Sequence, residues 1–257
     1  MIPNPTRKVL SIFRKHQVQA LLMGGQACVF YGAAQFSRDT DFVVLCEPPN
    51  IERLLAALAE LQAECMAVPE FDVALLQRGH AIHFRCQAPD AVGMRVDIMA
   101  TMRGVDPFPL LWERRVSLED LNGDVWDLLS VPDLVQAKKT QRDKDWPMIR
   151  ALVESHYLRH SSAPRTEDVL FWLRETRTPE ILSACRTAFP AEWATMIEQR
   201  PLLKLFTDDK SADAEAAIDR ALMEEELAER TLDREYWKPL RAELEQLRWT
   251  RSTGDAQ

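Results

Sequence analysis

The sequence lacks three features that would place it in a specialised class of protein. Its five cysteines are scattered, odd in number and free of any C-x-x-C motif, which favours reduced thiols packed as small apolar residues. No run approaches the ~18 apolar residues of a membrane span, so no membrane partner is expected. Positive charge is not in excess, because 32 Lys and Arg stand against 40 Asp and Glu. No global field that attracts nucleic acid is therefore expected.

The remaining composition is that of an ordinary globular protein. Of the 257 residues, 46% are hydrophobic and 28% are charged, which provides the core of one large domain or two modest ones. The first residues carry charges every few positions, so no signal peptide is expected. Together with the reduced cysteines, this predicts a cytoplasmic protein.

Two predicted strands frame the first candidate site. Residues 18–23 are apolar and stop at Gly24 and Gly25, and the residues that follow are compatible with a helix. Residues 41–46 predict a second strand, for which Asp-Thr-Asp provides the start. Asn50 is the predicted N-cap of the next helix.

Further strands are predicted at residues 81–86 and 93–99 and after an Asn-Gly turn signal at 122–123. In the strand at 93–99, Met94, Val96 and Ile98 share one face, and Arg95, Asp97 and Met99 share the other.

The second part of the chain changes to a helical pattern. Ser130 and Asp133 form an S-x-x-D helix start, and Pro147 is expected to lie at the start of a second helix. No strand-like run occurs after about residue 160. We therefore predict an α+β fold: a small mixed sheet with flanking helices in a domain at 1–160, followed by an all-α region at 161–257.

Three aspartates border apolar strands in the first domain. Asp39 and Asp41 share a face because they are two apart on a strand, and Asp97 lies on the polar face of its own strand. If the strands are neighbours, the three carboxylates repel one another unless they bind a hard cation. Magnesium suits such oxygens, and two ions bridged by Asp39 and Asp41 would orient a nucleotide's phosphates. Gly24 and Gly25 would let backbone N–H groups approach phosphate oxygens.

This pattern of Gly-Gly, thirteen intervening residues, Asp-x-Asp and a later strand Asp resembles the nucleotidyltransferase superfamily of the polymerase-beta type. The segments "RDTDFVV", "GMRVDIM" and "DLVQAKKTQRDKDW" are similar to the subgroup that includes the AbiEii-type toxins and related small bacterial nucleotidyltransferases. The resemblance covers residues 15–155.

The resemblance implies a magnesium-dependent enzyme with two bound ions and a nucleoside triphosphate, such as ATP, as substrate. Gly24 and Gly25 would hold the triphosphate, and Asp39 and Asp41 would bind the metals. Asp97 would complete the metal site and help to deprotonate the acceptor hydroxyl. A role in a toxin–antitoxin pair rests on the family analogy alone, and the acceptor (RNA, protein or small molecule) is open.

The resemblance also implies a set of cations that neutralise phosphate charge. These would be Lys138 or Lys139, with Arg142 and Lys144. Lys138 and Arg142 are four apart in the sequence, so on a helix they would share a face and form an anion clamp.

Three alternatives stay open. The fold could serve as a non-catalytic nucleotide sensor or a protein-interaction scaffold. Residues 208–230 carry nine acidic residues against three basic ones, which indicates a solvated helix or a surface for a protein partner. His156 and His160 are four apart on a predicted helix, a spacing that can bind zinc, although a solvated helix face is the simpler interpretation.

Overall fold

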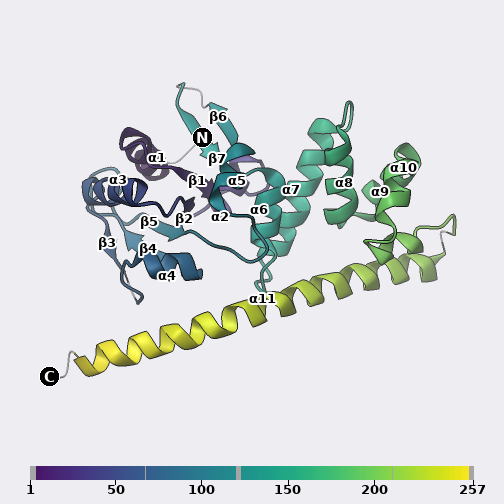
Figure 1. The fold of residues 1–257 in the computed structure, drawn as a ribbon. Helices are drawn as coiled ribbons and strands as arrows, with labels where there is room; N and C mark the ends of the chain where they lie inside the picture. Colours follow the sequence, from purple (N-terminus) through teal and green to yellow (C-terminus); the bar gives the residue numbers. More distant parts are fainter. Residues whose placement is uncertain (1–3, 67, 120–122, 210, 255–257) are drawn as a thin grey trace. The chain divides into compact units, whose positions relative to one another are not determined.

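The computed structural model describes residues 4–66, 68–119, 123–209 and 211–254 (Figure 1). The chain forms two compact units. Unit 1 comprises Met1–Phe30, Ala34–Ala137 and Tyr236–Gln257, and unit 2 comprises Tyr31–Ala33 and Lys138–Glu235. The domain boundary near residue 160 stays a prediction. Among the described residues, no helix combines the length and the apolar character that crossing a membrane requires.

Unit 1 contains one mixed sheet of seven strands. In spatial order these are β3 (Glu64–Cys65), β4 (Ile82–Arg85), β5 (Arg95–Met99), β2 (Asp39–Val44), β1 (Ala20–Met23), β7 (Val125–Leu128) and β6 (Val116–Glu119). The pairs β2–β5 and β1–β7 are parallel, and the other neighbours are antiparallel. The predicted mixed sheet is confirmed, and β3 and β6 are strands that the sequence pattern did not indicate.

Helices flank this sheet. Those of unit 1 are α1 (Asn4–Lys15), α2 (Gly24–Phe30), α3 (Pro48–Glu60), α4 (Val73–Arg78), α5 (Phe108–Glu113), all but the last residue of α6 (Val131–Lys138), and the carboxyl-terminal part of α11 (Ala212–Gly254). Phe13 of α1 stacks on Phe42 of β2, with ring centroids 4.4 Å apart. Successive strand residues point to opposite faces, so α1 packs on the face that Asp39 and Asp41 do not share.

Two sequence-based expectations about helix starts have different outcomes. Ser130 lies immediately before α6, and Asp133 lies in the first turn of that helix. Ser130 donates a hydrogen bond to Asp133 at 2.6 Å, which confirms the predicted S-x-x-D start. The prediction that Asn50 is an N-cap is wrong. Glu47 is the N-cap of α3, and Asn50 is buried inside the helix. Its side chain donates to the carbonyls of Gln19, which precedes β1, and Leu45, which follows β2.

Unit 2 is entirely helical in its described part. It contains α7 (Asp145–His160), α8 (Thr166–Glu175), α9 (Pro179–Ala188), α10 (Pro190–Met196), the short 3-10 helix η1 (Pro201–Leu205) and the amino-terminal part of α11. Trp146, Trp172 and Trp193 are buried in its core. No strand follows β7 among the described residues, which confirms the all-α region.

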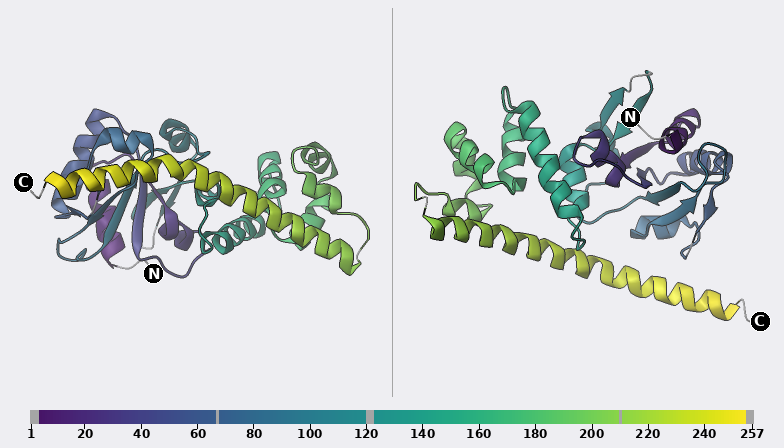
Figure 2. Two further views of the ribbon diagram at one scale, coloured as in Figure 1. Left: turned by 90° about the horizontal axis from the view of Figure 1, so that it is seen from below. Right: turned by 180° about the vertical axis from the view of Figure 1, so that it is seen from behind.

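Helix α11 is one unbroken helix of 43 residues with Pro239 in its interior (Figure 2). Proline lacks the N–H that would bond the carbonyl of Glu235, and Glu235 is also the last residue assigned to unit 2. Within unit 1, Glu243 of α11 accepts a hydrogen bond from Arg78 at 2.7 Å and lies 2.6 Å from the ring of the buried His80. The five cysteines are all free.

Candidate functional site

Three aspartates meet on one face of the sheet in unit 1. β2 and β5 are neighbouring parallel strands, and Asp41 lies directly opposite Asp97 in their register. Asp39 precedes Asp41 by two residues, so all three side chains leave the same face. Adjacent strands lie about 4.8 Å apart and residues two apart on one strand about 6.6 Å. The three residues therefore form one small group, called here the carboxylate patch, and the predicted condition that their strands be neighbours is met.

The glycine pair lies against this patch. Gly24 follows β1 and begins α2, and Met23, the last residue of β1, is opposite Asp41 in the β1–β2 register. Gly24 has a positive φ of 66°, and a Cβ at this position would lie 1.9 Å from Oδ2 of Asp41. A Cβ on Gly25 would lie 2.7 Å from Oγ of Ser37. Only glycine allows the chain to pass this close to the Asp41 carboxylate.

Gln26 follows the glycine pair and is fully buried. Neither its side-chain oxygen nor its side-chain nitrogen has a hydrogen-bond partner within the described part of the chain. A buried amide without partners costs about 1–3 kcal/mol, and a bound water or ligand is one way to satisfy such a group.

Arg95 and His83 belong to the same group of side chains, and the sequence patterns did not single them out. Arg95 donates two hydrogen bonds to Asp97, Nε to Oδ1 at 2.7 Å and Nη2 to Oδ2 at 2.8 Å. His83 is opposite Asp97 in the β4–β5 register. Its Nδ1 lies 2.9 Å from Oδ1 of Asp97 and 3.0 Å from Nη2 of Arg95. One ring nitrogen cannot donate and accept at once, so only one of these contacts is a hydrogen bond at a time.

These contacts shift the acid–base balance of the patch. Burial raises the pKa of Asp97, but the hydrogen bonds from His83 and Arg95 outweigh it, so the pKa is lowered overall. The pKa of Arg95 is raised, mainly by its hydrogen bonds to Asp97 and also by the attraction of Asp39 and Asp41. The guanidinium of Arg95 is thus within electrostatic reach of all three carboxylates.

The carboxylate patch has the oxygen donors that a hard cation prefers. Asp97, however, is paired with Arg95 instead of being free to bind a cation. Carboxylate oxygens are the ligands that magnesium prefers. Both oxygens of Asp97 accept from Arg95. Among the described residues, no group of three or more His, Cys, Asp or Glu side chains is arranged to hold a metal ion. The guanidinium of Arg95 provides positive charge at the patch.

The predicted clamp of Lys138 and Arg142 does not have the expected geometry. Helix α6 ends at Lys138, and Arg142 lies in the turn before α7, so the two residues do not share a helical face. Both instead bind the buried carboxylate of Asp145, Lys138 through Nζ at 3.0 Å and Arg142 through Nε at 2.7 Å. Thr140 donates to the same carboxylate at 2.6 Å.

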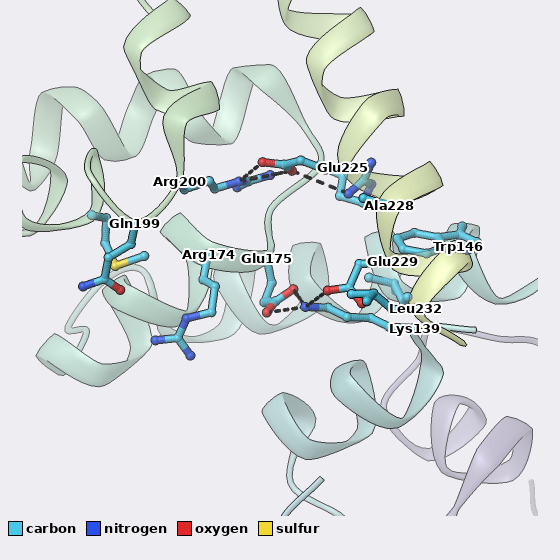
Figure 3. Close-up of a pocket in the computed structure, with 13 residues that line it drawn as sticks. Lys139, Trp146, Arg174, Glu175, Gln199, Arg200, Glu225, Ala228, Glu229 and Leu232 are labelled. Carbon is cyan, nitrogen blue, oxygen red and sulfur yellow. Dashed lines mark hydrogen bonds and ion pairs between the residues drawn. The ribbon is translucent and has the colours of Figure 1, made fainter. Parts of the chain in front are cut away.

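Lys139 is also paired. It lies in a pocket of about 400 Å³ in unit 2 whose charged lining also includes Arg174, Glu175, Arg177, Arg200, Glu225 and Glu229. Figure 3 shows Lys139 between Glu175 and Glu229, and Arg200 facing Glu225. The closest contacts are 2.9 Å for Lys139 with Glu175 and 2.7 Å for Arg200 with Glu225. Part of the acidic segment 208–230 thus balances cations inside unit 2. Lys144 is exposed.

The histidine pair of the zinc alternative is part of an aromatic cluster. The rings of His156 and His160 have centroids 4.5 Å apart. Trp172 Nε1 donates to Nδ1 of His156 at 2.9 Å, which occupies that nitrogen. The nearest carboxylate oxygen to Nε2 of His156, on Asp168, lies 3.9 Å away. Arg165 donates to that carboxylate at 3.1 Å. The cluster is better explained as packing than as a zinc site.

No protein-family model and no curated protein matches the chain. Solved structures do match, among them a crystal structure from H. pylori that is described, provisionally, as a nucleotidyltransferase. It is 12% identical to this chain, the match covers 90% of this chain and 93% of that one, and the TM-score is 0.40. A likeness this distant does not indicate an activity, so any function has to be inferred from the residues of the site.

Proposed function

We propose that this protein is a nucleotidyltransferase of the polymerase-beta type. It would move a nucleoside monophosphate from a nucleoside triphosphate to an acceptor hydroxyl or phosphate and release pyrophosphate. The observation that supports this most is the register of β2 and β5, which sets Asp41 opposite Asp97 with Asp39 beside them. Grouped carboxylates repel one another unless a cation balances them, and magnesium bound by carboxylates is a common partner of nucleotide phosphates.

In this proposal, Asp39, Asp41 and Asp97 would hold a pair of magnesium ions. Asp97 would also take up the proton of the acceptor hydroxyl as the acceptor oxygen bonds to the α-phosphorus and the bond from that phosphorus to the leaving pyrophosphate breaks. Bound magnesium supplies neutralisation of the triphosphate charge and lowers the pKa of the acceptor hydroxyl. Gly24 and Gly25 bring the backbone close to the carboxylates without an intervening side chain. The protein's contribution is mainly positioning and electrostatic stabilisation.

The four basic residues have a weaker claim to the site. Lys138, Lys139 and Arg142 would contact phosphate only by giving up ion pairs that they form within unit 2. Lys144 forms no ion pair within the described ranges and stays a candidate. The acceptor, the preferred triphosphate, the AbiEii-type subgroup and a toxin–antitoxin role stay predictions from the family resemblance.

One observation favours a second candidate function. Asp97 is engaged through both oxygens by Arg95, so a nucleotide could bind without a metal ligand or base at that position. The protein would then be a nucleotide sensor on the same fold. The two candidates differ in one outcome, because only the transferase forms a covalent product.

Magnesium-dependent binding of the four nucleoside triphosphates to the full chain tests the proposal. The wild type is expected to bind at least one of them with magnesium and to lose that binding when magnesium is chelated. Asp41→Ala is expected to abolish it. Asp127→Ala, which changes another strand aspartate of unit 1, is the control and should bind as the wild type does. A folded wild type that binds no triphosphate would refute the nucleotide proposal.

A further inference from the structure

Arg95 provides a cation to the carboxylate patch from within the chain. It leaves the same face of β5 as Asp97, because the two residues are two apart on one strand. In the β2–β5 register it is directly opposite Asp39. Positions 39 and 41 of β2 and positions 95 and 97 of β5 therefore form a group of four neighbours, of which three are aspartates and one is Arg95.

The pairing of Arg95 with Asp97 engages the same carboxylate that a cation would use. The fork of the guanidinium engages both carboxylate oxygens at 2.7 and 2.8 Å, a geometry that is strong and specific. These hydrogen bonds use one lone pair of each oxygen, so a cation that binds Asp97 must share the carboxylate with the guanidinium or displace it. The guanidinium and a cation held by all three carboxylates would also repel each other at this distance.

Arg95 is nevertheless able to leave. Its side chain is 36% exposed, whereas that of Asp97 is 11% exposed. A long and partly exposed arginine side chain can move its charge into water while the shorter aspartate stays fixed on the strand. The exchange of one cation for another would thus need no movement of the sheet.

We propose that Arg95 is the internal counter-ion of the carboxylate patch and competes with a divalent cation for Asp97. This rests on the proposed function, because it takes Asp39, Asp41 and Asp97 as the cation ligands. Cation binding then requires Arg95 to release Asp97, and Arg95 sets the cation affinity of the site. The released guanidinium is available to an anion such as the triphosphate.

The chain offers a matched control in Arg114. It also donates two hydrogen bonds to one carboxylate, that of Asp133, at 2.8 and 2.7 Å. The side chains of this pair are 42% and 9% exposed, close to the values for Arg95 and Asp97. Arg114 also donates to Asp106 at 2.6 Å, so Arg114→Met removes a comparable two-bond pair and one further ion pair from the same unit, at residues outside β2 and β5. Arg85, opposite Arg95 on β4, provides a second control for a nearby exposed charge.

Titration of the full chain with Mn²⁺, with free Mn²⁺ followed by electron paramagnetic resonance and no nucleotide present, tests the proposal. Arg95→Met is expected to bind Mn²⁺ about tenfold more tightly than wild type, or more. That is the change for removing a unit charge about 6 Å from a divalent ion in a dielectric close to that of water. Arg114→Met and Arg85→Met are expected to change the affinity less than about threefold, because screening weakens exposed charges.

Two further variants keep the test decisive if Arg95→Met folds poorly. Arg95→Lys retains the charge but cannot engage both oxygens, so its affinity should lie between wild type and Arg95→Met. In an Asp97→Asn background, Arg95→Met should change the affinity less than in wild type, because the competition for Asp97 has been removed and only the charge repulsion remains. Urea unfolding shows which variants are folded.

The outcomes separate this inference from the proposed function. Mn²⁺ binding that needs Asp39 and Asp41 but is unchanged or weakened by both Arg95 variants overturns the role of Arg95 and leaves the transferase proposal standing. No Mn²⁺ binding by any folded variant overturns both. If Arg95→Met binds Mn²⁺ and the wild type binds none, Arg95 excludes the cation from Asp97 completely, which supports the proposal.

Discussion

Asp145 offers the sharpest test of how unit 2 is held together. Its side chain is 1% exposed and accepts hydrogen bonds from Lys138, Thr140 and Arg142. Burial raises the pKa of this carboxyl, but the attraction of Lys138 and Arg142 outweighs it and the pKa is lowered. Lys138 is itself only 6% exposed. Asp145→Asn would therefore leave a buried ammonium group without a counter-charge.

The structure sets the size of the effect. Removing one partner of a buried ion pair costs about 3–5 kcal/mol, and this is the loss in free energy of unfolding expected for Asp145→Asn. The double variant Asp145→Asn/Lys138→Met removes both charges and is expected to recover most of that loss. Asp143→Asn is the control: that side chain is 93% exposed and pairs with Arg230 at the surface, so its loss should cost less than about 1 kcal/mol.

Urea unfolding followed by tryptophan fluorescence measures these differences, with Trp146 adjacent to the altered residue. The folded-state pKa of Asp145 lies below its unfolded value, so its contribution is complete above the unfolded pKa of about 3.9 and is lost as the pH falls through the folded pKa. The wild type and Asp145→Asn should converge in acid. A cost below about 1 kcal/mol at neutral pH, or a double variant no better than the single one, would refute the reasoning and leave Lys138 free for phosphate.

Other substitutions test the remaining features. Gly24→Ala is expected to lower the free energy of unfolding by more than about 2 kcal/mol and to weaken Mn²⁺ binding, because the new Cβ would lie 1.9 Å from Asp41. Gly93 also has a positive φ, but a Cβ there would meet nothing within 4 Å. Gly93→Ala should therefore cost only about 1–2 kcal/mol and leave Mn²⁺ binding unchanged. The pKa of His156 is lowered to about 4, mainly by burial. Between about pH 6.5 and 4, His156 therefore binds a proton only in the unfolded state. Urea unfolding should show stability falling as the pH falls through this range, with a smaller slope in His156→Gln. Pro239→Ala should raise the free energy of unfolding by as much as about 3 kcal/mol, and an unchanged melting temperature would contradict this.

The faces of the site strands could be predicted from the sequence. Alternation alone assigned Asp39 and Asp41 to one face and separated Asp97 from Val96, because side chains alternate on any strand. The neighbourhood of β2 and β5 could not be predicted in this way, since 50 residues lie between Val44 and Arg95 and no local pattern specifies which distant strands pair. The family resemblance, rather than periodicity, was what brought Asp97 to the same site.

The errors have a common physical origin. His83 and Arg95 join the site through the registers of β4, β5 and β2, which are tertiary facts that spacing along the chain does not contain. The clamp of Lys138 and Arg142 assumed a helix through both residues. Helix α6 instead ends at Lys138, and both residues bind the buried carboxylate of Asp145, a contact that their spacing in the sequence does not reveal. Asn50 has the propensity of an N-cap, and its hydrogen bonds to the carbonyls of Gln19 and Leu45, which adjoin β1 and β2, override that local preference.

The most direct test of the proposed nucleotidyltransferase activity is label transfer from α-labelled nucleoside triphosphates. Wild type, the Asp39→Ala/Asp41→Ala variant and the Asp127→Ala control would each be incubated with magnesium and separate pools of total RNA, cell protein and small metabolites. We predict that label enters one pool with wild type and the control but not with the double variant, which would also identify the acceptor class. Triphosphate binding without label in any pool would contradict the transferase and favour a nucleotide sensor.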